Sequence, residues 1–338
     1  MNKIIFVIIV LCSFVKLYGN DFSYEFIDNG SAVRIIRYNG RNDAVVIPQN
    51  IENLPVTEIG YQAFNGCIFI NSIIIPDSVT AIGNYAFSRC FNLTNITIPN
   101  SVTFIGEWAF LFCERLASIT IPEGVTSIER YTFSNCINLT DISLPDGITS
   151  ISDNAFNNCK SLLNIIIPNS VAFIGEYAFT FCASLKTITI PENVITIGNN
   201  AFSRCDSLVE IVVEEANKIF SSSEGVLFNK DKTILIKFPI GREGLSYVIP
   251  ASVTTIGNYA FSFSRLTDIY LPSTITLIEE RAFNGCFFLS NINIPESVTY
   301  IGRYAFMACR ELRNIIISMH TNIDKEDFPN NIRIIYRD

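Results

Sequence analysis

The sequence predicts a repeat solenoid, a curved rod of stacked coils that is built mainly from short β-strands with short helical turns and is capped at both ends. Three observations support this prediction. Prolines recur every 23 residues, phenylalanines recur with the same step, and ten copies of one pattern run from about Ile47 to Ser318. A unit this short cannot bury its apolar side alone, so the copies must stack into one continuous core.

The repeat is read from its recurring residues. The unit is roughly I-P-x-x-V-T-x-I-G-x-x-A-F-x-x-C-x-x-L-x-x-I-x. The prolines are Pro76, Pro99, Pro122, Pro145, Pro168 and Pro191, and then Pro250, Pro272 and Pro295. The phenylalanines are Phe64, Phe87, Phe110, Phe133, Phe156, Phe179 and Phe202, and then Phe261, Phe283 and Phe306.

Each part of the unit has a predicted conformation. Residues 93–99, LTNITIP, alternate apolar and polar side chains as a strand does. Pro99 has no N–H and ends that strand. Residues 102–106, VTFIG, form a second short extended piece, and residues 107–113, EWAFLFC, are long enough only for one helical turn.

The first residues predict an export signal over residues 1–19. Lys3 gives the positive start, residues 4–15 are almost wholly apolar, and Gly19 is a small residue before a polar segment. The apolar run is too short to cross a bilayer. Two alternatives stay open, a first core strand and a lipoprotein processed at Cys12, although the bulky Leu11 fits that processing badly. No later segment is predicted as a transmembrane helix, so the mature chain is expected to be soluble and outside the cytoplasm.

The repeats divide the rest of the chain. Residues 20–46 are expected to form an N-terminal β cap, with two strands around the turn at residues 28–30. The pattern stops at residue 213, and a predicted β-hairpin insertion interrupts it. The predicted order is repeats 1–7 at 47–213, the insertion at 214–248, repeats 8–10 at 249–318, and a C-terminal cap at 319–338 with a last strand at 332–336.

The turn of the predicted hairpin, residues 229–232, can also be read as a cation loop. Only Asp231 supplies a carboxylate there, between two lysines, whereas a calcium loop needs several oxygen ligands. The hairpin is the favoured interpretation.

The pattern C-x-x-L-x-x-I-x-I-P-x-x-V-T-x-I-G-x-x-A-F resembles the BspA-like class of leucine-rich repeats, the treponemal type with 23-residue units. The copies that carry the resemblance are Cys136–Phe156, with Ile148 and Ser152 substituted, Cys159–Phe179, with Ala172 for Thr, and Cys182–Phe202, with Ile195 for Thr. The resemblance implies a curved leucine-rich-repeat-like solenoid, with the L-x-x-I-x-I strands on the concave face. Proteins of this class are mostly secreted or surface-displayed, and several are adhesins for host matrix proteins or other bacteria.

A cysteine recurs in almost every copy. The nine that follow residue 19 are Cys67, Cys90, Cys113, Cys136, Cys159, Cys182, Cys205, Cys286 and Cys309. An odd number cannot pair completely within one chain, and a 23-residue spacing with no histidine partner does not suit zinc. Disulfides, metal ligation and a reactive thiol remain alternatives to buried free thiols, which are the favoured interpretation.

Composition and motifs argue against several classes of function. The formal net charge of −8 leaves no basic surface for nucleic acid. His320 is the only histidine, which nearly removes histidine-based catalysis and metal sites. No G-x-S-x-G, Walker loop, H-E-x-x-H or G-x-G-x-x-G occurs, and carboxylate pairs such as Glu279 and Glu280 carry no sign of a glycosidase cleft. The sequence therefore predicts no enzyme, no catalytic residue, no cofactor and no metal.

Aromatic side chains are the first candidates for partner binding. A column before A-F, which includes Trp108, is either a stacking ladder for a sugar or protein, or a brace between coils. Residues that do not recur are better candidates, because a patch of exposed apolar groups marks an interaction surface. These are Phe104 and Phe112 in one repeat and Phe173 and Phe181 in another.

The second candidate surface is polar. The outward positions of successive L-x-x-I-x-I strands give a small-polar, weakly acidic face, for which plain solubility is the alternative. Its candidate contact residues are Asn95, Thr97, Ser118, Thr120, Asp141 and Ser143. A broad polar face suits a protein or glycan that is held by many weak contacts around a few aromatic anchors.

The predicted function is an exported, non-enzymatic binding protein, secreted or on the cell surface, that recognises an extracellular protein or glycan. The adhesin role comes from the resemblance. The alternative is a periplasmic or envelope scaffold with a partner of the same cell.

Overall fold

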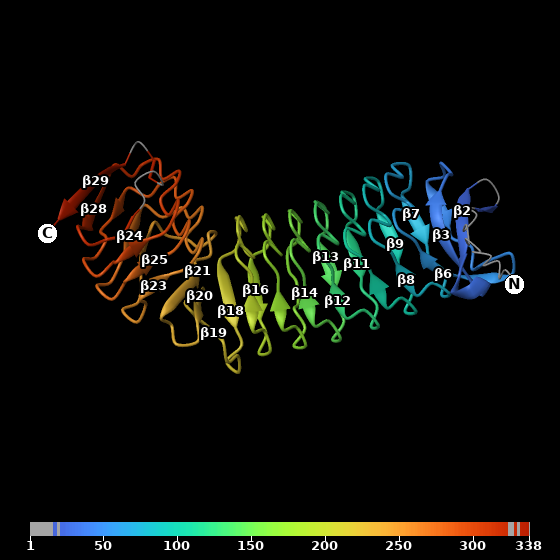
Figure 1. Ribbon diagram of the computed structural model, residues 1–338, viewed down its shortest axis with the longest axis horizontal. Helices are drawn as coiled ribbons and strands as arrows, with labels where there is room; N and C mark the ends of the chain where they lie inside the picture. The colour runs from blue at the N-terminus through green and yellow to red at the C-terminus, as the bar shows by residue number, and fades with distance from the viewer. Residues whose placement is uncertain (1–15, 19–20, 324–327, 330–331, 338) are drawn as a thin grey trace, which may run out of the picture.

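The computed structural model describes residues 16–18, 21–323, 328–329 and 332–337. The chain forms an elongated, bowed rod in which the coils stand side by side along the long axis, and the first and last described strands lie at opposite ends of the rod (Figure 1). The prediction of a repeat solenoid is confirmed. Most of the predicted signal segment, residues 1–15 and 19, lies outside the described residues.

Most coils contribute one strand to each of two long faces; residues 165–167 are an I-x-I segment that forms no strand. The I-x-I strands, which end the L-x-x-I-x-I segments, are β4 (Ala44–Val46), β7 (Ser72–Ile74), β9 (Asn95–Thr97), β11 (Ser118–Thr120), β13 (Asp141–Ser143), β16 (Thr187–Ile190), β18 (Glu210–Val213), β22 (Ser246–Val248), β24 (Asp268–Tyr270), β26 (Asn291–Ile292) and β28 (Asn314–Ser318). The V-T-x-I strands are β8 (Ala81–Ile82), β10 (Phe104–Ile105), β12 (Ser127–Ile128), β14 (Ser150–Ile151), β15 (Phe173–Ile174), β17 (Thr196–Ile197), β23 (Thr255–Ile256), β25 (Leu277–Ile278) and β27 (Tyr300–Ile301).

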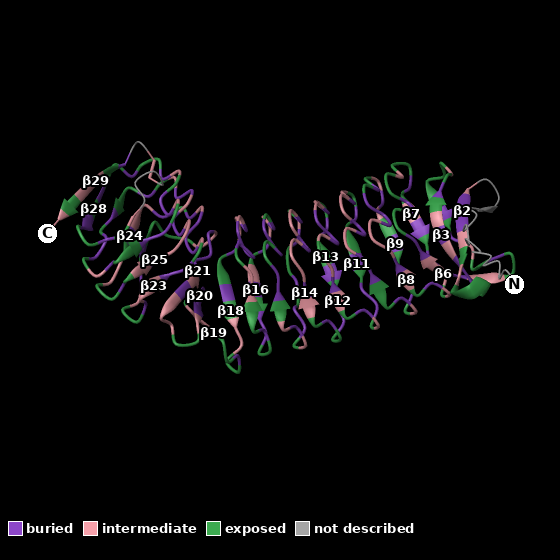
Figure 2. Cartoon of the chain, viewed as in Figure 1, coloured by how far each residue is buried: buried purple, intermediate pink, exposed green. Residues whose placement is uncertain are grey.

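The strands of neighbouring coils pair in parallel, so equivalent residues stand beside each other. Ser118 pairs with Asp141, and Ile128 pairs with Ile151, each one repeat further along the chain. Because side chains alternate across a strand, the first and third residues of each I-x-I triplet point inward and the residue between them points outward. Figure 2 shows this alternation of buried and exposed residues along the strands.

The phenylalanine of A-F forms the centre of the core. From Phe64 to Phe202, and again from Phe261 to Phe306, the centroids of neighbouring rings lie 5.2–5.8 Å apart. These rings are almost fully buried. Stacked aromatic side chains at this separation contribute both buried apolar area and a favourable ring–ring interaction.

The turn between the two strands differs from the helical turn expected for residues 107–113. In the described part of the chain the only helical segment is the 3-10 turn η1 (Asp28–Gly30). Two positions of each turn instead adopt positive φ, as at Trp108 (56°) and Phe112 (59°). Left-handed residues at this spacing prevent a continuous right-handed helix, which the apolar pattern alone did not reveal.

The turns of neighbouring coils are joined by backbone hydrogen bonds that all run in one direction. The N–H groups of Tyr85, Phe87 and Arg89 donate to carbonyl oxygens of the next coil, at 2.9, 2.8 and 2.6 Å. The residues between them close the turn within their own coil, as when the Ser88 N–H donates to the Tyr85 oxygen at 3.0 Å. Each turn therefore directs donors toward the C-terminal end of the rod and acceptors toward the N-terminal end.

Both ends of the stack carry additional strands. At the N-terminal end, β1 (Lys16–Tyr18), β2 (Phe22–Ile27) and β3 (Ala32–Tyr38) pair antiparallel, and β3 pairs in parallel with β6 (Leu54–Ile59). A short strand, β5 (Asn50–Ile51), turns back on β6. At the other end, β29 (Arg333–Arg337) pairs in parallel with β28, and the Phe328 ring stacks on Phe306 at 5.9 Å.

The insertion contains three strands, β19 (Phe220–Ser223), β20 (Val226–Asn229) and β21 (Ile234–Lys237), that pair antiparallel in that order. β21 then pairs in parallel with β23 of the following repeat. The sheet that ends at β17 does not continue into β21, and the buried apolar residues fall into two clusters that divide within the insertion. We call this boundary between Asn200 and Lys237 the seam.

Candidate functional site

The recurring cysteines are core groups that also donate a hydrogen bond. All nine are free thiols, and all but Cys67 are buried. The thiol of Cys113 donates to the backbone oxygen of Phe87 at 3.2 Å, and that of Cys136 donates in the same way to Phe110. The interpretation as buried free thiols is confirmed. Cysteine suits the position because it is small and apolar and carries a weak donor for a buried carbonyl of the preceding coil.

Most of the thiols are held in their unreactive form. Cys286 is the exception, because the raising effect of its burial is outweighed by hydrogen bonds with Cys309 and Ser264 and by the charge of Lys237, so that its pKa is lowered. Burial raises the pKa of Cys205 to about 12 and that of the less buried Cys67 to about 11. The thiolate is the nucleophile, so a raised pKa suppresses reaction. In the described part of the chain no group of three or more His, Cys, Asp or Glu residues is placed to hold a metal ion.

Thiol labelling of the folded protein is expected to modify Cys67 first. A maleimide reagent followed by mass spectrometry should find one modified cysteine at short times, and most of the others only after denaturant is added. Cys67→Ser should remove the early product. Rapid modification of Cys113 or Cys136 in folded protein would contradict the core assignment.

The aromatic column that contains Trp108 braces the turns. The Trp108 ring stacks on Tyr85 at 4.7 Å with an angle of 5° between the planes, and on Tyr131 at 5.7 Å with an angle of 12°. Both faces of the indole are therefore covered by neighbouring coils. A partner that contacts Trp108 meets the edge of this stack, so the structure favours the brace over the open sugar-stacking ladder at this residue.

The second positive-φ position of each turn forms a neighbouring column that includes Phe112 and Phe181. Asn135 and Asn158 occupy the same position in other repeats, which fits the tolerance of asparagine for positive φ. Phe112 is half-buried and Phe181 is exposed. The Arg204 guanidinium lies between the rings of Phe181 and Phe263, 5.3 and 4.9 Å from their centroids. We call Trp108, Phe112 and Phe181 the turn ridge.

Phe104 and Phe173 lie on a different surface. They occupy the outward position of the V-T-x-I strands β10 and β15 and are 46% and 38% exposed. In the strands next to them this position holds a small residue, Ala81 beside Phe104 and Ser150 beside Phe173. The extra aromatic residues of one repeat, Phe104 and Phe112, are therefore placed on a strand and in a turn.

The six polar candidates come together on neighbouring strands. They are the outward residues of β9, β11 and β13, and all six are exposed: Asn95, Thr97, Ser118, Thr120, Asp141 and Ser143. We call them the polar strip.

Exposed apolar residues occupy the same outward column on both sides of the polar strip. Ile74 and Ile166 are 59% and 83% exposed, and Val248 and Tyr270 continue the column further along the rod. Ile74 and Ile166 are not among the candidates predicted from the sequence. The pattern that could have identified them is the loss of alternation at residues 73–75 and 165–167, where three isoleucines replace the usual apolar-polar-apolar order.

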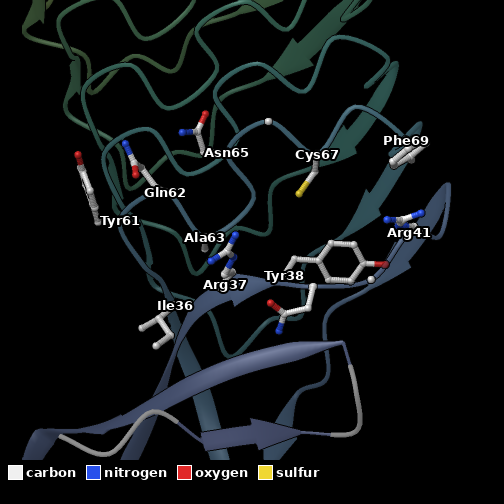
Figure 3. Close-up of a pocket in the computed structure, with 13 residues that line it drawn as sticks. Ile36, Arg37, Tyr38, Arg41, Tyr61, Gln62, Ala63, Asn65, Cys67 and Phe69 are labelled. Atoms are coloured by element: carbon white, nitrogen blue, oxygen red, sulfur yellow. The ribbon is translucent and has the colours of Figure 1, made fainter.

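A pocket of about 520 Å³ lies between the N-terminal cap and the first repeat turn. Arg37 and Arg41 line it, and Figure 3 shows Tyr61 and Gln62 at one end and Arg41 at the other. Figure 3 also shows the sulfur of Cys67 directed toward the side formed by Tyr38. Two guanidinium groups beside aromatic rings can bind an anionic group such as a carboxylate.

The chain belongs to the BspA-type leucine-rich repeat family. The model of that repeat region matches in six copies, over residues 42–162, 113–234 and 244–336. The resemblance seen in the repeat pattern is thus confirmed. No curated protein matches the chain.

Solved bacterial structures share the fold. A leucine rich cell surface protein from Faecalibacterium prausnitzii A2-165 is 28% identical with a TM-score of 0.70, covering 96% of this chain and 94% of that one. The pneumococcal vaccine antigen PcpA is 20% identical with a TM-score of 0.63, over 96% and 94% of the two chains. A leucine-rich repeat protein from Bacteroides ovatus is 23% identical with a TM-score of 0.52, over 95% and 100%.

The family and these structures are repeat scaffolds related to bacterial cell-surface proteins. Among the described residues, none of the helical structure is long and apolar enough to cross a membrane.

Proposed function

We propose that this chain is an exported, non-enzymatic binding protein of adhesin type, secreted or held on the cell surface, that recognises a host or neighbouring-cell protein or glycan. The observation that carries the proposal is the placement of Phe112 and Phe181. Both hold bulky aromatic side chains at a positive-φ position where most other repeats carry asparagine, glycine, arginine or alanine. Hydrogen bonds between coils impose the positive φ in every turn, so the fold does not require an aromatic ring here, and contact with a partner is a reason to retain one.

Two further observations support the proposal. Phe104 and Phe173 expose aromatic rings on a strand face where neighbouring coils carry small residues. Exposed aromatic groups are the commonest anchors of protein interfaces. In addition, the 28% identical protein from Faecalibacterium prausnitzii is described as a cell surface protein.

The test is a binding screen of residues 20–338 against matrix proteins and glycans. The affinity for the partner that binds best is then measured with three double variants of this chain. Phe112→Asn with Phe181→Asn should weaken binding at least about tenfold, which is the size expected for loss of an aromatic anchor. Phe104→Ser with Phe173→Ser tests the strand face. Ser118→Arg with Ser143→Arg tests the polar strip by placing two large charged groups on it.

Both replacements of aromatic residues should be compatible with the fold, because asparagine and serine already occupy these positions in other repeats. Far-ultraviolet circular dichroism and the unfolding midpoint should therefore match those of the unchanged protein. Unchanged affinity in all three variants would show that binding uses none of these surfaces.

The alternative is a periplasmic or envelope scaffold with a partner of the same cell. Protease treatment of intact cells separates the two functions. Digestion of the chain is expected for an adhesin, whereas full protection of the chain until the envelope is opened would favour the scaffold.

A further inference from the structure

The seam is the place where the hydrogen bonds between turns stop. In the regular repeats the N–H groups at the equivalents of Asn200 and Phe202 donate to the next coil, as Tyr177 does to Asn199 at 3.1 Å and Phe179 to Ala201 at 2.8 Å. Among the described residues, the N–H groups of Asn200 and Phe202 have no hydrogen-bond acceptor. Because donors of every turn are directed toward the C-terminal end, these two belong to the side of the turn that faces the insertion.

A buried lysine stands on the other side of the seam. Lys237 precedes Phe238, whose ring stacks on Phe261 at 5.3 Å, so it occupies the position that alanine holds in most repeats. It is only 5% exposed. Its Nζ donates to the Tyr259 backbone oxygen at 3.1 Å and to the Ser262 hydroxyl at 3.2 Å.

This ammonium group has no carboxylate partner in the described part of the chain. The groups whose charge acts on it are the thiols of Cys205 and Cys286, which are themselves buried, and its pKa is lowered to about 8 by burial. No ion pair to a carboxylate involves Lys237 among the described residues. Burial of an uncompensated charge is costly, so a positive group in this place favours a counter-ion.

The two sides of the seam meet at a cavity of about 50 Å³. Asn200, Phe202 and Lys237 all line it, together with Leu227, Ile236 and Tyr259. Asn200 is only 8% exposed, and its Nδ2 makes no hydrogen bond of normal geometry among the described residues, although its side chain lies close enough to the Tyr177 hydroxyl to act on the pKa of that group. The cavity is therefore bordered by residues that carry one ammonium, one unpaired side-chain N–H group and two unpaired backbone N–H groups.

We propose that the seam cavity binds a single halide-sized anion, with chloride as the physiological occupant, held by Lys237 Nζ, Asn200 Nδ2 and the turn N–H groups of Asn200 and Phe202. Backbone N–H groups next to a left-handed residue form a concave site for anions, and Asn200 has a φ of 59°. A cavity of this small volume favours a single monatomic ion over a polyatomic anion such as phosphate. The anion compensates the buried cation and completes the donor set that the insertion leaves open.

The test is thermal unfolding of the unchanged protein at pH 6.5, in sodium chloride, sodium bromide and sodium gluconate at equal ionic strength. Chloride and bromide should raise the unfolding temperature in a saturable way, by about 2–4 °C at a tenfold excess over Kd. Gluconate is too large for the cavity and should give only the general effect of salt. Equal shifts in all three salts would overturn the proposal and indicate that the cavity holds water.

Lys237→Ala is the matched variant, since alanine is the residue that other repeats use at this position. It should fold and should lose the difference between chloride and gluconate. The halide effect should also weaken at pH 9, where Lys237 becomes neutral. Cys205, Cys286 and the Tyr259 hydroxyl are the other titratable groups near it, and Arg281 is bonded to Tyr259, so the comparison with Lys237→Ala separates their contribution.

Crystals soaked in bromide give a second readout that does not depend on stability. An anomalous peak in the cavity, in contact with Lys237 Nζ and Asn200 Nδ2, is the expected result. Absence of a peak there at a bromide concentration that saturates the thermal shift would refute the assignment of the site.

Discussion

Phe133→Ala is expected to destabilise the rod by about 3–5 kcal/mol, the cost of emptying a buried aromatic site. The Phe133 ring is fully buried and lies between Phe110 at 5.4 Å and Phe156 at 5.6 Å. Its removal opens a cavity in the middle of a continuous stack, and neighbouring coils that are fixed by the strand register cannot close it. Chemical denaturation followed by circular dichroism measures the loss.

Phe104→Ser is the control for this prediction, because it removes the same ring from an exposed position and should change stability by less than about 0.5 kcal/mol. Similar losses for the two variants would mean that Phe133 is not in the core column.

Lys237→Met is expected to stabilise the protein by about 3 kcal/mol near pH 7 in halide-free buffer, where no counter-ion compensates the ammonium. The folded-state pKa of Lys237 is lowered from 10.5 to about 8 by burial. Methionine fills similar volume without a charge. The Tyr259 oxygen keeps a donor, because the Ser262 N–H also binds it at 3.1 Å.

The pH dependence of this gain has a defined sign. Below pH 8 lysine is protonated in both states, and the native state carries the full cost of burial. Between pH 8 and 10.5 the unfolded state binds more protons than the native state, so the wild type gains stability relative to the variant as pH rises. The advantage of Lys237→Met should therefore be largest below pH 8 and vanish above about 10.5.

The difference between variant and wild type is the quantity to measure, because the buried thiols titrate in both proteins. Urea unfolding at pH 7, 9 and 10.5 in sodium gluconate is sufficient. A difference that stays constant over this range would show that folding does not lower the pKa of Lys237.

The fold could be predicted from the sequence because one repeat pattern occurs ten times. Every copy places isoleucine and phenylalanine at the same offsets, all but one also place cysteine there, and parallel stacking is the arrangement that buries all copies together. The alternation of side chains along a strand also predicted correctly that Asn95, Ser118 and Asp141 are exposed. These features depend only on the repeat and on strand geometry.

The turn could not be predicted in the same way. Its apolar spacing fits a helical turn, and the positive φ at Tyr85, Trp108 and Tyr131 has no sequence signal, since tyrosine and tryptophan do not favour it. Tertiary hydrogen bonds between coils impose this conformation. Asn135 and Asn158 in the neighbouring column carried a weak hint, because asparagine tolerates positive φ.

The seam was hidden for a different reason. Lys237 lies in the segment that the sequence predicts as a hairpin, and a lysine in a strand normally points toward water. Only the position of Phe238 in the phenylalanine column shows that Lys237 stands in an inward alanine position. Prediction of the binding site stops at a similar point. Exposure shows that Phe104 and Phe181 are available for contact, but it does not identify the partner.

The single direction of the turn hydrogen bonds makes the rod polar along its long axis, so that its two ends are not equivalent. Each turn presents acceptors to the turn before it and donors to the turn after it, as Phe87 and Ala109 show. A duplicated 23-residue segment therefore fits at any point between two coils without a change to either neighbour. Under this rule gene duplication can lengthen the molecule freely, and only the two terminal caps and the insertion have to be fitted to a fixed place.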